Sequence, residues 1–181
     1  MRGVIMSYVG QIPETDAGPD LKPLYQQIHN NYGFVPNYFQ SQGALPQAIE
    51  AQLKISKAIL KDGALPTAVK EQIGLVVSGI NSSSYCIAAH VQALRNLGVE
   101  ETLGYQLATD YAVAPVPAKI MALFRFADKL TRNPVEIEKP DVDAVFKAGW
   151  DEAALRETVL TVALFNFINR VSFGLGLVGD F

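Results

Sequence analysis

Residues 66–97 read PTAVKEQIGLVVSGINSSSYCIAAHVQALRNL, and they indicate the fold class. Apolar residues recur at helical spacing in the first half, pause over a polar break at 81–84, and then recur in the second half. The apolar positions are Val69, Ile73, Val76, Val77 and Ile80, then Ile87, Val91, Leu94 and Leu97. The serines of the break offer oxygens that can cap a new helix. We therefore predict helices over about 66–80 and 84–97, with Pro66 in the first turn of one and Gly98 ending the other.

The same periodicity continues on both sides of this stretch. It predicts further helices over about 20–31, 46–61, 100–111, 118–132, 140–148 and 151–173, with a short turn or helix over 37–43. Glycines and prolines punctuate the boundaries, and no alternating strand pattern of useful length occurs. The sequence thus predicts an all-α protein, a single-domain helical bundle over residues 1–181. It should have about seven to nine helices and an irregular N-terminal segment, 1–19.

The composition narrows the classes of function. Hydrophobic residues make up 49% of the 181 residues, charged residues make up 18%, and the mean hydropathy is +0.15. Because this is rich in apolar surface, we expect a homo-oligomer that buries the surplus between subunits. The net charge of −3 and the scattered basic residues argue against a nucleic-acid partner. No apolar run reaches the roughly 18 residues of a membrane span, and one cysteine suits a reducing compartment, so we expect a cytoplasmic protein without a membrane partner.

Residues 83–90, Ser-Ser-Tyr-Cys-Ile-Ala-Ala-His, carry the chemistry. Cys86, which is the single cysteine, and His90, one of two histidines, stand four residues apart, which places both on one face of a helix. A thiol beside an imidazole can form a thiolate near neutral pH, and the unpaired N–H groups of a helix start favour that anion. Glu71 on the preceding helix could orient His90 or relay protons. We therefore predict Cys86, His90 and Glu71 as catalytic, in a dry pocket that suits a small peroxide.

Plainer interpretations of the same residues stay open. A lone cysteine in a helix is often a small buried hydrophobe, and a lone histidine on an apolar face is often a satisfied core residue. One cysteine, one histidine and one distant glutamate fall short of the usual four-ligand zinc set. We therefore predict no metal and no cofactor.

The spacing around Cys86 resembles a known family motif. Glu71 stands twelve residues before Ser83, and Cys86 and His90 follow Ser83 at the third and seventh positions. This arrangement resembles the alkylhydroperoxidase D-like, or carboxymuconolactone decarboxylase-like, superfamily, in particular its branch of peroxidase-related proteins. That family carries a glutamate and then Cys-x-x-Cys-x-x-x-His. The resemblance extends to residues 33–37, 127–134 and 165–170.

The resemblance implies an all-α fold whose subunits form trimers or hexamers. In redox-active members the second cysteine attacks the peroxide, the first resolves the sulfenic acid as a disulfide, and the glutamate and histidine move protons. Carried over, Cys86 is the peroxidatic thiol, with His90 and Glu71 as the proton relay. Ser83 occupies the resolving-cysteine position. A hydroxyl cannot form a disulfide, so the two-cysteine cycle is unavailable within this chain.

Three further residues are candidates for lining a pocket. Asn169 and Arg170 lie with Asn166 in an otherwise apolar helix, and buried polar groups need partners. These side chains either bond to the backbone, cross an interface or line the pocket. Tyr85 either donates a hydrogen bond near the thiol or packs.

Three hypotheses for the function follow. The first is a thiol-dependent peroxidase of one-cysteine type, which takes a peroxide and an external thiol or protein reductant. The second is non-redox acid–base chemistry on a small organic acid or lactone, in which Glu71 and His90 act without the thiol. The third is a catalytically inactive oligomeric member of the family.

Overall fold

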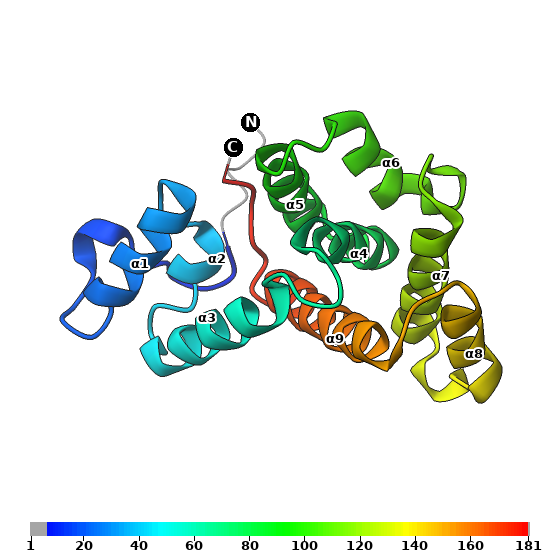
Figure 1. The fold of residues 1–181 in the computed structure, drawn as a ribbon. Coiled ribbons are helices and arrows are strands. Elements are labelled where there is room, and N and C mark those ends of the chain that lie inside the picture. The colour runs from blue at the N-terminus through cyan, green and yellow to red at the C-terminus, as the bar shows by residue number, and fades with distance from the viewer. Residues whose placement is uncertain (1–6, 181) are drawn as a thin grey trace. The chain divides into compact units, whose positions relative to one another are not determined.

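The computed structural model describes residues 7–180, and every regular element among them is a helix (Figure 1). The α-helices are α1 (Lys22–Tyr32), α2 (Asn37–Gln40), α3 (Pro46–Leu60), α4 (Thr67–Ile80), α5 (Ser84–Asn96), α6 (Glu101–Asp110), α7 (Ala118–Arg132), α8 (Lys139–Lys147) and α9 (Glu152–Gly174). Three 3₁₀ turns accompany them: η1 (Glu14–Asp16), η2 (Tyr111–Val113) and η3 (Pro134–Glu136). The all-α prediction is confirmed for this part of the chain. The predicted irregular segment holds η1, and its first six residues lie outside the described range.

The chain divides into two compact units, which we describe separately. The terminal unit comprises the residues up to 58 together with those from 171 onward, and the central unit comprises residues 59–170. The single-domain organisation stays a prediction.

The terminal unit is held together by hydrogen bonds between its two chain segments. The backbone N–H of Asn37, at the start of α2, donates to Asp180 at 2.7 Å, and the N–H of Tyr8 donates to the Leu175 carbonyl at 3.0 Å. The buried Tyr25 hydroxyl of α1 donates to the Ile12 carbonyl at 2.9 Å. Burial raises the pKa of Tyr25 to about 12, so this phenol stays a donor. The first two bonds join the N-terminal segment to the C-terminal residues, and the third lies within the N-terminal segment.

The central unit is built around α4. All residues from Val69 to Ser78 are buried, because α5, α6 and α7 each pack against this helix. Gly79 lets α6 approach closely, since a Cβ at that position would overlap the backbone of Ala108. Because neighbouring helices cover α4 on several sides, its middle is apolar from Ile73 to Val77 with only Gly74 interrupting, and its buried polar residues lie before and after this run.

Helix boundaries follow the sequence prediction closely, with three local differences. Pro66 lies at the N-cap of α4 rather than in its first turn. Ser83 takes the N-cap position of α5, but its side chain makes no cap hydrogen bond among the described contacts. Leu97, the last apolar position of the predicted helix, is 49% exposed. It follows the last helical residue, with φ −91° and ψ 7°, so the apolar face of the helix ends before it. Gly98 takes φ +80° as the predicted helix terminator.

No single helix among residues 7–180 is long and apolar enough to cross a membrane, and only α6 with η2 and α7, bent by 81°, pass that test as a pair.

Candidate functional site

The site begins with a contact between α4 and α5. Nδ1 of His90 on α5 lies 2.7 Å from Oε2 of Glu71 on α4. The side chains are 16% and 10% exposed, respectively, so water competes little for this bond. A carboxylate only accepts hydrogen bonds, so a carboxylate at Glu71 requires the proton of this contact to lie on Nδ1 of His90. The structure therefore brings together two of the three residues predicted as catalytic.

Cys86 lies one helical turn before His90 on the same helix. It is the third residue of α5 and is 1% exposed. Side chains four residues apart on a helix are neighbours, so the thiol and the imidazole share one face of α5. The first turn of a helix has unpaired N–H groups that favour an anion, which is the position predicted for Cys86.

Ser83, at the resolving-cysteine position, is also buried, with 1% exposure. Its N–H donates to the Ser78 carbonyl at 2.9 Å, and its own carbonyl accepts from the Ile87 N–H at 2.9 Å. Ser82 before it has a φ of +57°, a left-handed conformation that non-glycine residues adopt at some cost. The turn from 81 to 83 is thus tight and specific, and it sets where α5 begins.

The sequence analysis missed Phe165, which α9 brings to the site. Its ring lies edge-on to the His90 ring, with 4.5 Å between centroids and an interplanar angle of 64°. Phe165 reaches this place because Gly74 of α4 has no side chain; a Cβ there would overlap the phenyl ring. The sequence did contain a signal, because Gly74 inside an otherwise apolar helix indicates that another group packs closely there. It does not indicate which distant residue that is.

A chain of polar side chains links α9 to the end of α4. The amide of Asn169 donates to the Ser78 hydroxyl at 3.1 Å and accepts from Asn81 at 2.8 Å. Asn81 also donates to Asn166 at 3.0 Å. Asn169 and Ser78 are fully buried. Asn169, predicted as a possible pocket residue, therefore lies beside the turn that precedes Cys86.

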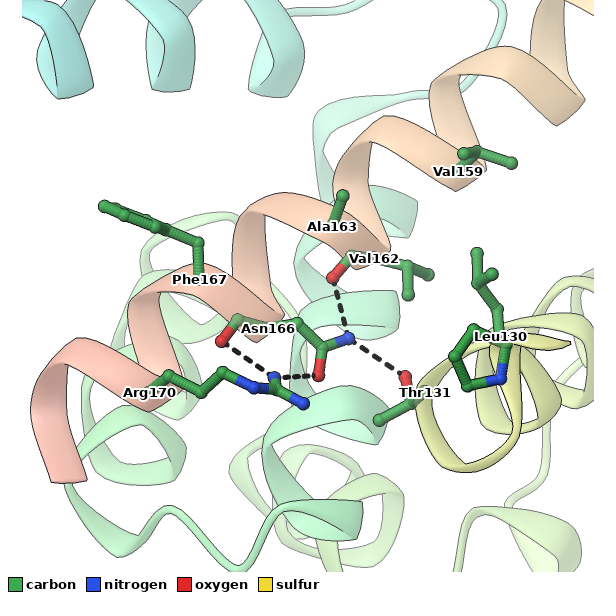
Figure 2. Close-up of a pocket in the computed structure, with 9 residues that line it drawn as sticks. Leu130, Thr131, Val159, Val162, Ala163, Asn166, Phe167 and Arg170 are labelled. Atoms are coloured by element: carbon green, nitrogen blue, oxygen red, sulfur yellow. Dashed lines mark hydrogen bonds between the residues drawn. The ribbon is translucent and has the colours of Figure 1, made fainter. Parts of the chain in front are cut away.

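Arg170 lies on a different side of α9, at a surface pocket of about 330 Å³ (Figure 2). One guanidinium nitrogen donates to the side chain of Asn166 at 2.6 Å and to its carbonyl at 3.0 Å. The pocket is lined by Leu130, Thr131, Pro134, Val159, Val162, Ala163, Asn166, Phe167 and Arg170. None of Glu71, Cys86 and His90 lines it. Tyr85, the third possible pocket residue, is half-buried at the start of α5 and does not line it either.

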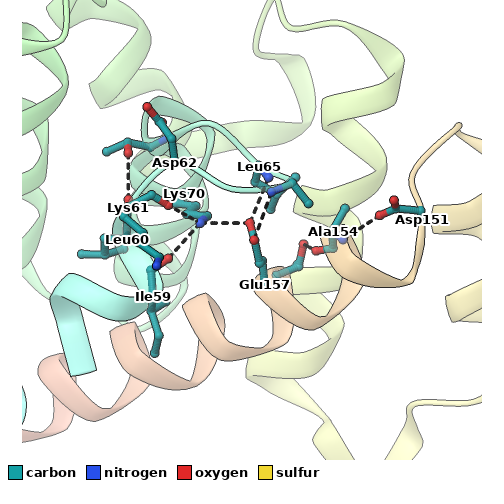
Figure 3. A network of polar contacts seen from close by, with 12 residues as sticks. Ile59, Leu60, Lys61, Asp62, Leu65, Lys70, Asp151, Ala154 and Glu157 are labelled. Carbon is teal, nitrogen blue, oxygen red and sulfur yellow. Dashed lines mark hydrogen bonds and ion pairs between the residues drawn. The ribbon is translucent and has the colours of Figure 1, made fainter. Parts of the chain in front are cut away.

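An ion pair between the buried Lys70 and the half-buried Glu157 lies at the first turn of α4, next to Glu71 (Figure 3). Lys70, 1% exposed, lies 2.9 Å from Glu157 of α9 and also donates to the carbonyls of Ile59 and Lys61. Glu157 in turn accepts from the N–H groups of Ala64 at 3.0 Å and Leu65 at 2.9 Å. Burial alone would raise the pKa of Glu157, but these N–H groups and Lys70 outweigh it and hold the pKa below its ordinary value.

Within residues 7–180 no three histidine, cysteine, aspartate or glutamate side chains gather as a metal site would require.

Comparison with known proteins finds a matching family model and a similar sequence. Residues 46–129, which include Glu71, Cys86 and His90, match the model of the carboxymuconolactone decarboxylase family. An uncharacterized protein of Cupriavidus necator is 31% identical over 104 residues, which cover 57% of this chain and 87% of that protein.

Solved structures share the fold over nearly the whole chain. An uncharacterized peroxidase-related protein from Silicibacter sp. TM1040 is 25% identical with a TM-score of 0.89, covering 99% of this chain and 95% of that one. A peroxidase-related protein from Ralstonia eutropha JMP134, described as an alkylhydroperoxidase AhpD core, is 24% identical with a TM-score of 0.89, covering 96% and 92%. The debrominase Bmp8, crystallised with 2,3,4-tribromopyrrole, is 21% identical with a TM-score of 0.82, covering 97% and 93%.

Proposed function

This chain belongs to the carboxymuconolactone decarboxylase family, and we propose that it is a thiol-dependent peroxidase of one-cysteine type. The observation that carries the proposal is the Glu71–His90 hydrogen bond of 2.7 Å, one helical turn from the buried Cys86. A carboxylate that holds Nδ1–H leaves Nε2 as a base on the face of α5 that Cys86 shares. The peroxidase-related proteins of the same fold are consistent with this chemistry.

The first half-reaction needs only groups on α4 and α5. His90 takes the proton of the Cys86 thiol, and Glu71 stabilises the imidazolium that forms. The thiolate attacks the terminal hydroxyl oxygen of a hydroperoxide, so an S–O bond forms as the O–O bond breaks. The sulfur loses two electrons to become a sulfenic acid, and the departing alkoxide takes the proton from His90 and leaves as an alcohol.

The second half-reaction needs a reductant from outside the chain. Ser83 offers a hydroxyl where a resolving thiol would stand, so the sulfenic acid must react with an external thiol. That thiol displaces water and forms a mixed disulfide, and a second thiol releases Cys86. A reducing compartment such as the cytoplasm supplies these thiols, which is where we place the reaction.

Peroxide turnover with dithiothreitol tests the proposal. We expect the wild type to consume cumene hydroperoxide, a dione probe to trap a sulfenic acid at Cys86, and Cys86→Ser to abolish both. His90→Ala should slow turnover by about 10²-fold or more. His29→Ala, which changes the other histidine, on α1, should leave the rate unchanged. A Cys86→Ser variant as active as the wild type would contradict the proposal.

The Glu71–His90 contact also favours a second candidate, acid–base chemistry on a small organic acid or lactone. Such a reaction uses the carboxylate–imidazole pair and needs no thiol. It predicts the reverse pattern, in which His90→Ala abolishes turnover of a lactone and Cys86→Ser is tolerated. A chain that responds to neither class of compound is an inactive member of the family.

Association of several copies is part of the proposal. Helix α9 exposes apolar side chains along one face, with Val159 at 37%, Leu160 at 51% and Phe167 at 50% exposure. The pocket of Figure 2 continues this face onto α7. A contiguous apolar surface of this kind is typical of subunit interfaces, and it supports a homo-oligomer, with a trimer or a hexamer proposed.

A further inference from the structure

We propose that Asn169 is a positioning residue for the Cys86 thiol, acting through the turn between α4 and α5. This inference rests on the thiol chemistry proposed above and adds a residue that acts through the turn rather than on the reacting atoms. Asn169 holds the last turn of α4, that turn fixes the start of α5, and the start of α5 determines how strongly its N–H groups stabilise a thiolate at Cys86.

The first step is the pair of hydrogen bonds by which Asn169 holds the last turn of α4. Its Nδ2 donates to the Ser78 hydroxyl at 3.1 Å, and its Oδ1 accepts from Asn81 at 2.8 Å. Ser78 and Asn81 are three residues apart, so one amide spans the final turn of the helix. An amide carries both a donor and an acceptor, and both are used here. Asn169 is fully buried, so water cannot replace either bond if the amide is removed.

The second step leads from α4 to Cys86 through the backbone. Ser78, held by Asn169 through its hydroxyl, accepts the Ser83 N–H at its carbonyl at 2.9 Å. Ser82 between them keeps a left-handed φ of +57°, a conformation that persists only where the surroundings impose it. Ser83 is the N-cap of α5, and Cys86 lies three residues beyond it. A shift of this turn therefore changes the direction of the N–H groups in the first turn of α5, where Cys86 lies.

The third step is the anchoring of Asn169 itself. Helix α9 also carries Phe165, four residues before Asn169, and the Phe165 ring packs against the His90 ring. Asn166 accepts from Asn81 at 3.0 Å, so two residues of α9 hold the same amide. The helix that steadies the imidazole thus also fixes the turn before the thiol.

The ultraviolet absorbance of the thiolate, followed against pH, tests this role. Because the chain has one cysteine, the difference between each protein and its Cys86→Ser counterpart reports Cys86 alone. Asn169→Leu keeps the approximate volume and removes both hydrogen bonds. We expect it to move the thiolate midpoint up by about one pH unit, the scale of one helix-end interaction.

The matched control is Thr158→Val on the same helix. Thr158 is also fully buried, and its hydroxyl donates to the Ala154 carbonyl within α9, so the change removes a buried hydrogen bond that does not reach α4. It should lower the unfolding temperature and leave the midpoint where it was. Ser78→Ala is a milder change that removes one of the two hydrogen bonds of Asn169 and should move the midpoint in the same direction by less. It provides the test if Asn169→Leu does not fold.

Two results would overturn the inference: an unchanged midpoint in folded Asn169→Leu or Ser78→Ala, or an equal shift in Thr158→Val, which would mean general loosening. The titration does not depend on turnover. A shifted midpoint in a protein that does not reduce peroxides leaves the positioning role standing and refutes the peroxidase. An unshifted midpoint in an active peroxidase does the opposite.

Discussion

Ser83 occupies the position that the family resemblance assigns to a resolving cysteine. The position is buried at the N-cap of α5, three residues before the buried Cys86. Its backbone is held at both the N–H and the carbonyl. Under the proposed one-cysteine reaction, a cysteine at this position would supply a resolving thiol.

Ser83→Cys should therefore give a protein that forms an internal disulfide with Cys86 when treated with peroxide. We expect a loss of two hydrogens by mass spectrometry and no overoxidised sulfur, whereas the wild type accumulates sulfinic acid when no thiol is supplied. Ser84→Cys is the control, because Ser84 is exposed and one residue out of place. Two reduced thiols in peroxide-treated Ser83→Cys would count against the assigned role of this position.

At the scale of elements, α9 holds α4 at three levels. The Glu157–Lys70 pair lies at the first turn of α4, Phe165 packs over Gly74, and Asn169 grips the last turn. Glu157 also holds the loop before α4 through the backbone of Ala64 and Leu65. A Cβ at Gly63 would overlap the carboxylate, so the loop and Glu157 fit closely.

Glu157→Gln should lower the free energy of unfolding near neutral pH by about 2 kcal/mol, because a charged hydrogen-bond acceptor is lost beside a buried lysine. The pKa of Glu157 in the folded protein lies below its ordinary value of 4.5. The stabilisation is therefore present above pH 4.5 and disappears as the pH falls through the lowered folded value. The difference between wild type and variant in urea unfolding should shrink in the same interval.

Glu152→Gln on the same helix is the comparison for that series. Glu152 forms an exposed i,i+4 pair with Arg156, which contributes little to stability. We expect a change within about 0.5 kcal/mol and no added dependence on pH. Equal losses of unfolding free energy in the two variants would show that the contacts of Glu157 stabilise the protein no more than an exposed ion pair does.

At the scale of the whole molecule, the sequence predicted the helices well because their apolar stripes are local. The bounds of α7 and the turn at Gly98 follow directly from periodicity and glycine. The Glu71–His90 contact was also within reach, since a short turn folds α5 back on α4. The sequence could not predict the contact of Phe165 or the hydrogen bonds of Asn169. Both depend on how α9 packs against α4, which lies more than eighty residues earlier in the chain. The sequence placed Leu97 in the apolar stripe of α5, because its spacing fits that stripe. The helix ends at Asn96, so Leu97 does not continue the buried face.

Phe167→Glu should reduce the assembly to a smaller species, because it places a charge in the exposed apolar face of α9. Light scattering after size exclusion measures the mass directly. Val113→Glu, at an equally apolar site of 67% exposure on η2, is the control and should leave the mass unchanged. A wild type that elutes as a monomer would contradict the proposed homo-oligomer.

The contribution of α9 to the site also sets the order in which a new chain acquires it. During synthesis Glu71, Cys86 and His90 leave the ribosome together, and α4 and α5 can pair at once because they are neighbours in sequence. Phe165 and Asn169 emerge some seconds later at ordinary rates of translation. In that interval the nascent protein carries Glu71, Cys86 and His90 without the helix that packs against His90 and holds the end of α4, so the residues proposed as catalytic are synthesised before those that hold them in place.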